Sequence, residues 1–263
     1  MPNIITLTTD FGLRDPFVGI MKGVILGIAP DVDVVDITHD IPSYDILDAA
    51  FMIDTAYRYF PPGTIHVVIV DPGVGSARRP IAASAKGHVF VAPDNGLLSY
   101  VLQSDTAAPS PSAYWIKNQS LFLKAISQTF HGRDIFAPVA AHLALGTPIE
   151  SVGPPIADFV KKPLPKLRSR GGKLVGTVLR IDKFGNIITN FKKSHLGTDF
   201  TIHVAGLSIT RLYSTFSEAE PGEFFAVEGS TGYIELALNQ GSAADRLNVS
   251  LGAEIELETP SVN

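Results

Sequence analysis

The fold is decided by residues 67–79, which read VVIVDPGVGSARR. Four consecutive β-branched residues are typical of a buried strand, and the proline–glycine pair at 72–73 ends it. Asp71 therefore stands where the strand ends, and Arg78 follows on a glycine-rich loop that is long enough to fold back over it. Ligands of open α/β sheets bind beyond the carboxyl ends of the strands. A carboxylate and a guanidinium in this position predict a binding site.

Strand and helix patterns alternate on both sides of this stretch. Short apolar runs predict strands, and apolar residues at helical spacing predict helices. The expected strands are residues 4–9, 32–37, 67–70, 81–85 and 88–92, the last two as a hairpin, and the expected helices are residues 17–28, 45–57 and 134–145. This alternation predicts an α/β domain over residues 1–151, with a mostly parallel sheet flanked by helices on both faces.

The composition changes after residue 151. Residues 152–173 contain four prolines and no apolar periodicity, which is typical of a linker. Residues 174–263 show almost no helical pattern and hold short strand-like runs separated by glycine-containing turns. They predict an all-β, barrel-like domain. Its expected strands are residues 174–181, 199–204, 224–227, 233–238 and 253–258.

The composition limits the class of protein. The chain has 263 residues, of which 45% are hydrophobic and 18% charged, and its net charge is −5, without a long basic stripe. These values are typical of a globular protein that does not bind nucleic acid. The absence of cysteine excludes disulfides, thiolate metal ligands and a cysteine nucleophile. The N-terminal residues lead straight into a strand, and no uncharged apolar stretch approaches the ~20 residues of a membrane span. We therefore expect a cytoplasmic protein with no membrane partner.

Polar residues also follow other elements of the first domain. Asp10 ends the first strand, where one carboxylate can accept hydrogen bonds from both hydroxyls of a ribose. His131 stands just before a glycine and a helix start, where side chains project into a cleft, and Asp134 can cap that helix or stabilise its N-terminus by its charge. An aspartate after a strand can equally cap a turn, and a loop histidine is commonly just exposed. Both interpretations stay open on these residues alone.

In the second domain, Phe184 and Asn186 flank Gly185 in a turn between two strands. An aromatic face beside an amide suits adenine, because the base can stack on the ring and form hydrogen bonds at its edge. An ordinary hairpin with a bulge at Gly185 explains the same residues equally well.

A metal site is the main rival explanation for the acidic residues. Asp10, Asp40, Asp71, Asp94 and His131 could in principle assemble a site for a hard cation. The sequence has no HExxH motif and no tight cluster of aspartate and histidine at ligand spacing. We therefore expect no required metal.

Five motifs stand in order along nearly the whole chain. They are Thr9–Gly12, Asp71–Arg78, Pro93–Leu98, Phe130–Asp134 and Asp182–Asn190. Together they resemble the family of S-adenosylmethionine (SAM)-dependent hydroxide adenosyltransferases, which also includes the fluorinase and the chlorinase. The resemblance implies an N-terminal α/β domain, a C-terminal β-barrel, and a homotrimer whose active sites lie at subunit interfaces.

The resemblance also implies roles for individual residues. Asp10 would hold the ribose hydroxyls, and Tyr44 would line the sugar and methionine region. Asp182 would meet the ammonium group of methionine, and Ser230 its carboxylate. Thr231 departs from the halogenating relatives, which have an arginine near this carboxylate.

Four further residues would bind the adenine. Phe184 and Phe216 would sandwich the base, and Asn186 and Asn239 would meet its edge.

Asp71, Arg78 and His131 match the triad associated with water activation in the hydroxide branch of the family. Halogenating relatives have a neutral tyrosine in place of Asp71. A carboxylate about 4 Å from a bound halide would repel it by about 4 kcal/mol at an effective dielectric constant of about 20. The chain also lacks the long insertion that the fluorinase carries between the strands expected at 81–85 and 88–92. Both features favour water over halide as the nucleophile.

The implied reaction is hydrolysis of SAM to adenosine and L-methionine by in-line attack of water or hydroxide on C5′. SAM is then the substrate, and no cofactor is expected. Three alternatives stay open: a SAM-dependent halogenase, a non-catalytic adenosine-binding protein and a metal-dependent hydrolase.

Overall fold

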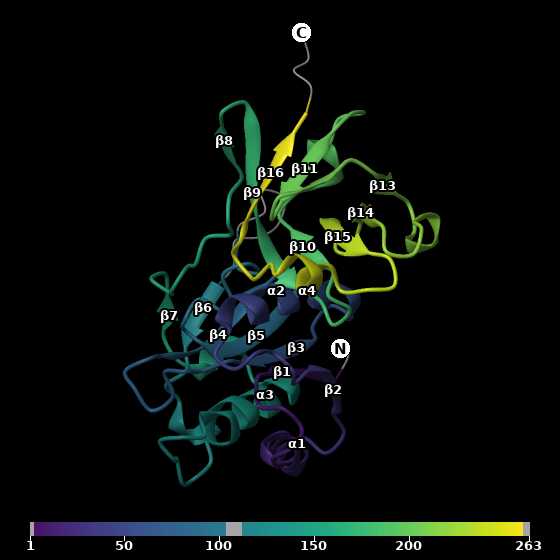
Figure 1. Ribbon diagram of the computed structural model, residues 1–263. Helices are drawn as coiled ribbons and strands as arrows, with labels where there is room; N and C mark the ends of the chain where they lie inside the picture. The colour runs from purple at the N-terminus through teal and green to yellow at the C-terminus, as the bar shows by residue number, and fades with distance from the viewer. Residues whose placement is uncertain (1–2, 104–111, 260–263) are drawn as a thin grey trace. The chain divides into compact units, whose positions relative to one another are not determined.

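The computed structural model describes residues 3–103 and 112–259 of the chain. The chain forms two compact units, Met1–Pro163 and Leu164–Asn263, and each has its own sheet (Figure 1). Within the described ranges, none of the helices combines the length and the apolar character needed to cross a lipid bilayer.

The N-terminal unit contains a seven-stranded sheet with the order β2-β1-β3-β5-β4-β6-β7 (Figure 1). Its strands are β1 (Ile4–Thr9), β2 (Asp33–Thr38), β3 (Ile65–Ile69), β4 (Pro80–Ala85), β5 (His88–Pro93), β6 (Ser112–Trp115) and β7 (Pro155–Ile156). The first four strands of this order pair in parallel, whereas β4, β6 and β7 pair antiparallel to their neighbours. The expectation of a mostly parallel sheet was therefore only partly correct, because the sheet is mixed.

The hairpin of β4 and β5 explains the change of direction. Lys86 and Gly87 join the two strands, and both have positive φ, 54° and 80°. Positive φ at both positions is the mark of a type I′ turn, whose twist matches that of the strands it joins. The predicted hairpin is confirmed, and it places β4 antiparallel to the four parallel strands β2, β1, β3 and β5.

Three α-helices of the N-terminal unit follow the predicted pattern closely. They are α1 (Phe17–Ile28), α2 (Ile46–Ala56) and α3 (Ala137–Ala144). Short helical turns are η1 (Tyr57–Tyr59), η2 (Gln119–Leu121), η3 (Gly132–Phe136) and η4 (Ile149–Val152). Asp45 begins α2 as its N-cap, since its carboxylate accepts hydrogen bonds from the backbone N–H groups of Leu47 and Asp48 at 3.1 and 2.9 Å.

The helix expected at 134–145 begins differently from the prediction. Its first part, η3, is a π-helical turn in which the N–H of Ala137 donates to the carbonyl of Gly132. Pro138 has no N–H to offer the carbonyl of Asp134, and that carbonyl accepts instead from Leu123 at 3.0 Å. The wide turn therefore joins the helix to the preceding loop.

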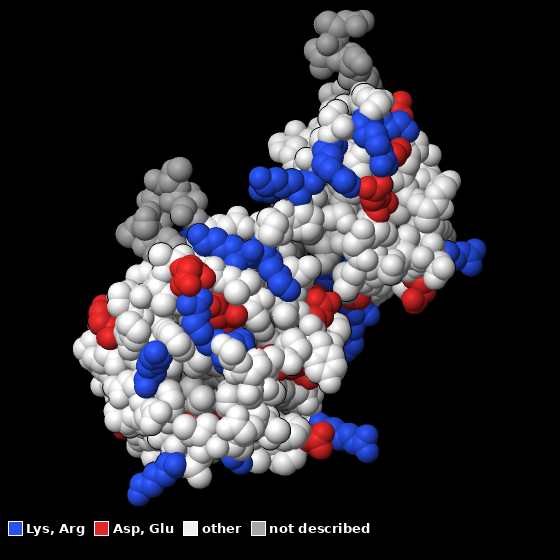
Figure 2. All heavy atoms as spheres, turned by 90° about the vertical axis from the view of Figure 1, so that its left-hand side faces the viewer, with Lys and Arg blue, Asp and Glu red and all other residues white. Residues whose placement is uncertain are grey.

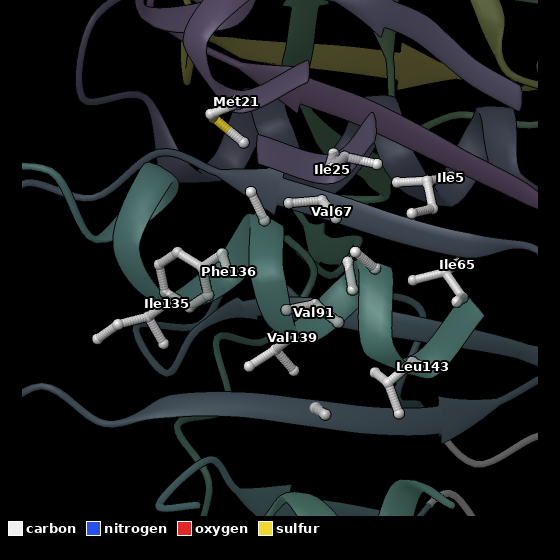
Figure 3. Close-up of a cluster of buried hydrophobic side chains, with 14 of the residues drawn as sticks. Ile5, Met21, Ile25, Ile65, Val67, Val91, Ile135, Phe136, Val139 and Leu143 are labelled. Carbon is white, nitrogen blue, oxygen red and sulfur yellow. The ribbon is translucent and has the colours of Figure 1, made fainter. Parts of the chain in front are cut away.

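Side chains of the central strands alternate between two hydrophobic clusters. Ile65, Val67 and Ile69 of β3 belong to a cluster with α1 and α3, which Figure 3 shows. Val68 and Val70 belong to a second cluster, which includes Ala49 and Ile53 of α2. Helices therefore contribute to the cores on both faces of the sheet, as the near-continuous apolar character of β3 predicts.

The C-terminal unit is a nine-stranded, curled sheet with the order β12-β11-β16-β9-β10-β15-β14-β13, and β8 also pairs with β9. Its strands are β8 (Arg168–Arg170), β9 (Lys173–Ile181), β10 (Ile187–Thr189), β11 (Thr201–Val204), β12 (Leu207–Ile209), β13 (Leu212–Tyr213), β14 (Phe224–Glu228), β15 (Ile234–Leu238) and β16 (Glu254–Glu258). Its helical segments are η5 (Lys193–His195), η6 (Phe216–Glu218) and α4 (Ala243–Leu247). In this order β12 and β13 stand at opposite ends, so the described sheet is an open half-barrel.

Residues 152–173, expected as a linker, contain β7 and β8. The prolines that suggested a linker are compatible with these very short strands at the margins of the two sheets. On the C-terminal unit, Figure 2 shows basic and acidic side chains interleaved on the face that carries β8. Arg168 and Arg170 pair there with Glu254 at 2.5 and 3.0 Å. The positive charges of this face are thus matched by carboxylates.

Candidate active site

A cavity of about 440 Å³ lies at the carboxyl ends of β1 and β3 in the N-terminal unit. Asp10 follows β1, Asp71 follows β3 after one residue, and both line this cavity. Tyr44 and His131 line it as well. Four of the residues singled out in the sequence are therefore brought together at the sheet edge where ligands of α/β proteins bind.

Arg78 connects Asp71 with His131. Its Nε donates to Asp71 Oδ1 at 3.1 Å, and its Nη2 donates to Asp71 Oδ2. The same Nη2 lies 3.2 Å from His131 Nδ1, although 53 residues separate the two in the chain. The side chains of Arg78 and Asp71 are only 7% and 6% exposed. The three groups predicted as a triad thus form one hydrogen-bonded cluster, in which Asp71 and His131 reach the cavity wall.

A close contact between two loops makes this cluster possible. Gly75 has φ +76°, and a Cβ built on it would stand 2.3 Å from the carbonyl oxygen of Gln128. No side chain fits there, so only glycine allows the loop after β3 to lie directly on the loop before His131. The glycine-rich pattern noted in the sequence therefore serves the approach of Arg78 to the imidazole.

The protonation of His131 follows from its neighbours. A guanidinium is always a donor, so Nδ1 must accept from Arg78 and carry a lone pair. Burial, and then the positive charge of Arg78, lower the pKa of His131 below its usual value. The imidazole is therefore neutral near pH 7, with its proton on Nε2.

One nitrogen of Arg78 has no protein partner. Its Nη1 is fully buried and finds no hydrogen-bond acceptor among the described residues. The guanidinium lies 5.4 Å from the centre of the Phe136 ring, which offers it only a cation–π contact. A buried donor without an acceptor costs free energy.

Tyr44 has a strained backbone beside Asp10. Its φ is +70°, which is rare for a bulky residue, and its side chain is 71% exposed. The Tyr44 N–H donates to Asp10 Oδ2 at 2.9 Å, and this bond helps to hold the unusual conformation. Strain of this kind is concentrated at ligand sites.

Sequence reasoning missed other residues of this cavity. Phe11, Phe17 and Phe130 line it and pack edge to face, with ring centres 5.2 to 5.9 Å apart. Asp15 also lines it and adds a third carboxylate to Asp10 and Asp71, whereas the described lining contains no lysine or arginine. The sequence feature that could have indicated Asp15 was an acidic residue in the turn between the first strand and the first helix. The cavity favours a positively charged ligand.

The C-terminal unit has its own cavity, of about 520 Å³, lined by Phe184, Asn186 and Phe216 together with Leu238, Gln240 and Gly241. Phe184 and Phe216 are 75% and 45% exposed, which is unusual for aromatic side chains. Gly185 between the first two has φ +82°, and a Cβ there would lie 2.0 Å from Ser242 Oγ. The turn therefore requires glycine, and it presents the ring beside the amide as the sequence predicts.

Three predicted residues do not line this cavity. Asp182 shapes the turn, because its Oδ1 accepts from the N–H groups of Phe184 and Asn186, both at 2.9 Å. Asn239 donates its amide to the Ala219 carbonyl at 2.6 Å, and Ser230 is exposed between β14 and β15. Their ligand contacts stay predictions.

Glu235 is a carboxylate that sequence reasoning missed. Burial raises its pKa, and the charge of nearby Asp182 adds to the shift. It stands on β15 at a position where the alternating pattern calls for an ordinary strand residue, so the sequence gave no signal for it.

Within the described ranges, no group of three or more histidine, aspartate or glutamate side chains is arranged to hold a metal ion. The fold and the two cavities define a small-molecule-binding protein with an α/β unit and a β unit.

Comparison with known proteins places it more narrowly: the chain belongs to the SAM hydroxide adenosyltransferase family. The family model of the N-terminal domain matches residues 5–153, and that of the C-terminal domain matches residues 176–256. The resemblance inferred from the five motifs is therefore confirmed.

Relatives of known name support the assignment over nearly the full length. An (R)-S-adenosyl-L-methionine hydrolase of Salinispora tropica is 38% identical over 259 residues, which cover 96% of this chain and 97% of the relative. One of Thermus thermophilus is 38% identical over 261 residues, covering 95% and 97%. A fluorinase of Nocardia brasiliensis is 31% identical over 294 residues, covering 97% and 96%.

Solved structures resemble the chain as well. An uncharacterized conserved protein of Thermotoga maritima has a TM-score of 0.89 and 35% identity, covering 97% of this chain and 100% of that chain. A conserved hypothetical protein of Thermus thermophilus has a TM-score of 0.78 and 36% identity, covering 96% and 98%.

Proposed function

We propose that this chain is an enzyme that hydrolyses S-adenosyl-L-methionine to adenosine and L-methionine. Its relatives are named as hydrolases of (R)-S-adenosyl-L-methionine, which supports this substrate and this class of reaction. The observation that carries the proposal is the hydrogen-bonded cluster in which Arg78 bridges Asp71 and His131 at the cavity wall. Three carboxylates in the same wall suit a substrate that carries a positively charged sulfonium.

The difficulty of this reaction lies in activating the nucleophile and not in the leaving group. The sulfonium leaves as a neutral thioether, so the leaving group needs no proton and no metal. Water has a pKa of ~15.7 and an ordinary aspartate ~3.9, so complete proton transfer before attack would cost about 16 kcal/mol. Water must therefore attack C5′ in line with the departing sulfur and lose its proton late.

The cluster of Asp71, Arg78 and His131 would activate the water by orienting it and by hydrogen bonding to it. His131 Nδ1 accepts from Arg78 and is not available as a base. The positive charge of Arg78, held between Asp71 and His131, can stabilise the hydroxide character that develops on the water. Asp71 fixes the guanidinium through two hydrogen bonds and offers its remaining lone pairs to the water.

The remaining contacts follow from the two cavities. Asp10 and Tyr44 would hold the ribose and line the sugar region. Phe184 and Phe216 would stack on the adenine, and Asn186 would bond its edge.

Three residues that do not line the cavity of the C-terminal unit complete the proposed substrate contacts. Asp182 and Ser230 would bind the methionine moiety, and Asn239 would reach the adenine edge. Their support is the family resemblance.

Water is favoured over halide because Asp71 occupies the cavity wall. A buried carboxylate beside the nucleophile site repels a halide but accepts a hydrogen bond from water. We further propose that the enzyme needs no cofactor, works in the cytoplasm and forms a homotrimer with active sites at subunit interfaces. The mass of the native protein in solution tests the last statement.

The test is the identity of the nucleoside product. Purified protein is incubated with SAM in H₂¹⁸O, with and without chloride and with and without EDTA. We expect adenosine with ¹⁸O on C5′ and unlabelled methionine in all four samples. Chlorinated nucleoside would show a halogenase, loss of turnover in EDTA a metal enzyme, and binding without turnover an adenosine-binding protein. Asp71→Asn serves as the inactive control.

A further inference from the structure

Asp134 is a buried charge outside the cavity lining. It is 0% exposed and stands in the π-helical turn η3, three residues after His131. Burial alone would raise the pKa of Asp134, but hydrogen bonds from Arg133 and Ser127 outweigh it and hold the pKa below its usual range. Burying a carboxylate is costly unless hydrogen bonds compensate, so its partners matter.

Those partners lie on two different segments. Arg133 Nε donates to Asp134 Oδ1 at 2.6 Å, and Arg133 Nη2 donates to Oδ2 at 3.1 Å. The backbone N–H of Ser127 donates to the same Oδ2 at 2.8 Å. Leu123 N–H donates to the Asp134 carbonyl at 3.0 Å. One residue thus fastens the preceding loop at two points.

This arrangement differs from a helix cap, the role that the sequence suggested for Asp134. His131 occupies the N-cap position of η3, and no side chain caps that turn. The Asp134 carboxylate accepts instead from a residue seven positions earlier in the chain. Capping was therefore the wrong alternative, because the wide π-helical turn directs the carboxylate toward the loop, whereas Asp134 does stand in the first turn, where an acid favours a helix N-terminus.

The loop that Asp134 fastens leads directly into His131. Ser127 Oγ accepts from the N–H of Phe130, the residue before His131, at 3.0 Å. The Ser127 backbone offsets a small part of the lowering of the His131 pKa that burial and Arg78 cause. His131 therefore follows a segment held by Asp134 and Ser127, and its Nδ1 faces Arg78.

We propose that Asp134 is a positioning residue for hydrolysis: by holding Ser127, it orients the His131 imidazole toward Arg78 and Asp71. The inference rests on the proposed function for its kinetic part only. Misplacement of a catalytic group by about 1 Å can cost on the order of 100-fold in rate, although binding of the substrate is unaffected.

The kinetic test compares two variants of Asp134 with one control. We expect Asp134→Ala to lower kcat at least tenfold while KM changes less than threefold. Asp134→Asn keeps one acceptor for Ser127 but brings an amide N–H toward Arg133, so kcat should fall about threefold. Arg133→Gln leaves the Ser127 bond intact and should retain kcat within twofold.

The outcomes separate positioning from mere stability. Circular dichroism and the thermal midpoint establish folding, and if Asp134→Ala does not fold, Asp134→Asn decides. Wild-type kcat in the folded variants would overturn the proposal. A loss in Arg133→Gln as large as in Asp134→Ala would overturn it too, since the ion pair would then be what matters.

A readout without turnover keeps this inference separate from the proposed function. In protein labelled with ¹⁵N-histidine, the His131 ring should show an unprotonated Nδ1 and a protonated Nε2 in the wild type and in Arg133→Gln. In Asp134→Asn or Asp134→Ala the two nitrogen shifts should move toward the averaged values of a free imidazole. An unchanged pair of shifts contradicts the positioning role, whether or not SAM is hydrolysed.

Discussion

The two cavities differ in how far their functional side chains are exposed. In the N-terminal unit the polar groups are buried and bonded to each other, with Arg78 7% and Asp71 6% exposed. In the C-terminal unit the cavity presents open aromatic faces, with Phe184 75% and Phe216 45% exposed. Groups that act on a transition state must be fixed before the substrate arrives, whereas a stacking surface needs only to be accessible. Changes in the first cavity should therefore reduce kcat, and changes in the second should raise KM.

The largest effect is expected for Arg78→Ala. It removes the donor that joins Asp71 to His131 and leaves a buried carboxylate unpaired. We expect kcat to fall about 1000-fold with little change in the Kd of SAM, as loss of a preorganised donor typically does. The free energy of unfolding should fall by about 3–5 kcal/mol.

Steady-state kinetics, calorimetric titration with SAM and urea unfolding measure the three quantities. Arg58→Ala, which removes an arginine that is 53% exposed, is the control and should leave all three unchanged. If Arg78→Ala weakened only the binding of SAM and left kcat unchanged, the proposed division between a catalytic N-terminal cavity and a binding C-terminal cavity would be wrong.

Acid should destabilise the N-terminal unit first. His66 is 0% exposed, and burial, with a contribution from His88, lowers its pKa to about 3. Unfolded histidine binds a proton near pH 6.5, so between these values the unfolded chain holds more protons than the folded chain. Stability is therefore lost as the pH falls from about 6.5 toward 3, by about 5 kcal/mol in total.

The chain's single tryptophan, Trp115 on β6, reports on this unit. Urea midpoints followed by its fluorescence should fall between pH 7 and pH 5, and His66→Gln should flatten the dependence. Equal slopes in wild type and variant would assign the acid sensitivity to other groups.

A smaller effect is expected for Phe184→Ala. Stacking of a base on an aromatic ring is worth about 1–3 kcal/mol, so KM for SAM should rise about tenfold while kcat changes less than threefold. The thermal midpoint should stay constant because the ring is largely exposed. Leu251→Ala, at another exposed apolar position of the same unit, is the matched control and should leave KM unchanged. A fall in kcat without a change in KM would contradict the stacking role.

The smallest effect is expected on the charged face of the C-terminal unit. Arg170 pairs with Glu254 and Glu256 at 3.0 and 2.9 Å, but its side chain is 58% exposed. Exposed ion pairs contribute little. Differential scanning calorimetry should find the same thermal midpoint for Arg170→Ala and wild type, at low and at high salt. A clear drop that disappears in salt would show that the interleaved charges stabilise the sheet.

The sequence predicts the positions of the helices and strands better than it predicts how the strands pair. The order of strands and helices around β3 could be read from apolar periodicity, and so could the glycine-rich loop that carries Arg78. Of the antiparallel part of the N-terminal sheet only the hairpin of β4 and β5 was predicted, and β6 and β7 were missed, because periodicity does not record strand pairing. The π-helical turn was missed too, since it arises from Pro138 and a loop contact rather than from a helical pattern.

The candidate site shows the same limit. Asp71, Arg78 and His131 lie together as expected, and the order of the motifs along the chain was what predicted them. Asp15 was missed because a single acid in a turn has no spacing to set it apart. Asp134 was noticed but given the wrong partner, since only coordinates show that its carboxylate reaches Ser127.

The turn at Lys86 and Gly87 has a practical consequence for protein engineering. It joins the end of β4 to the start of β5, and because β5 runs parallel to β3, it lies at the sheet edge opposite the one that holds Asp71. Exposed loop tips far from the chemistry are where inserted sequence is tolerated best. An affinity tag or a fluorescent reporter spliced between these two residues would let the enzyme be captured or followed in cells while it continues to turn over.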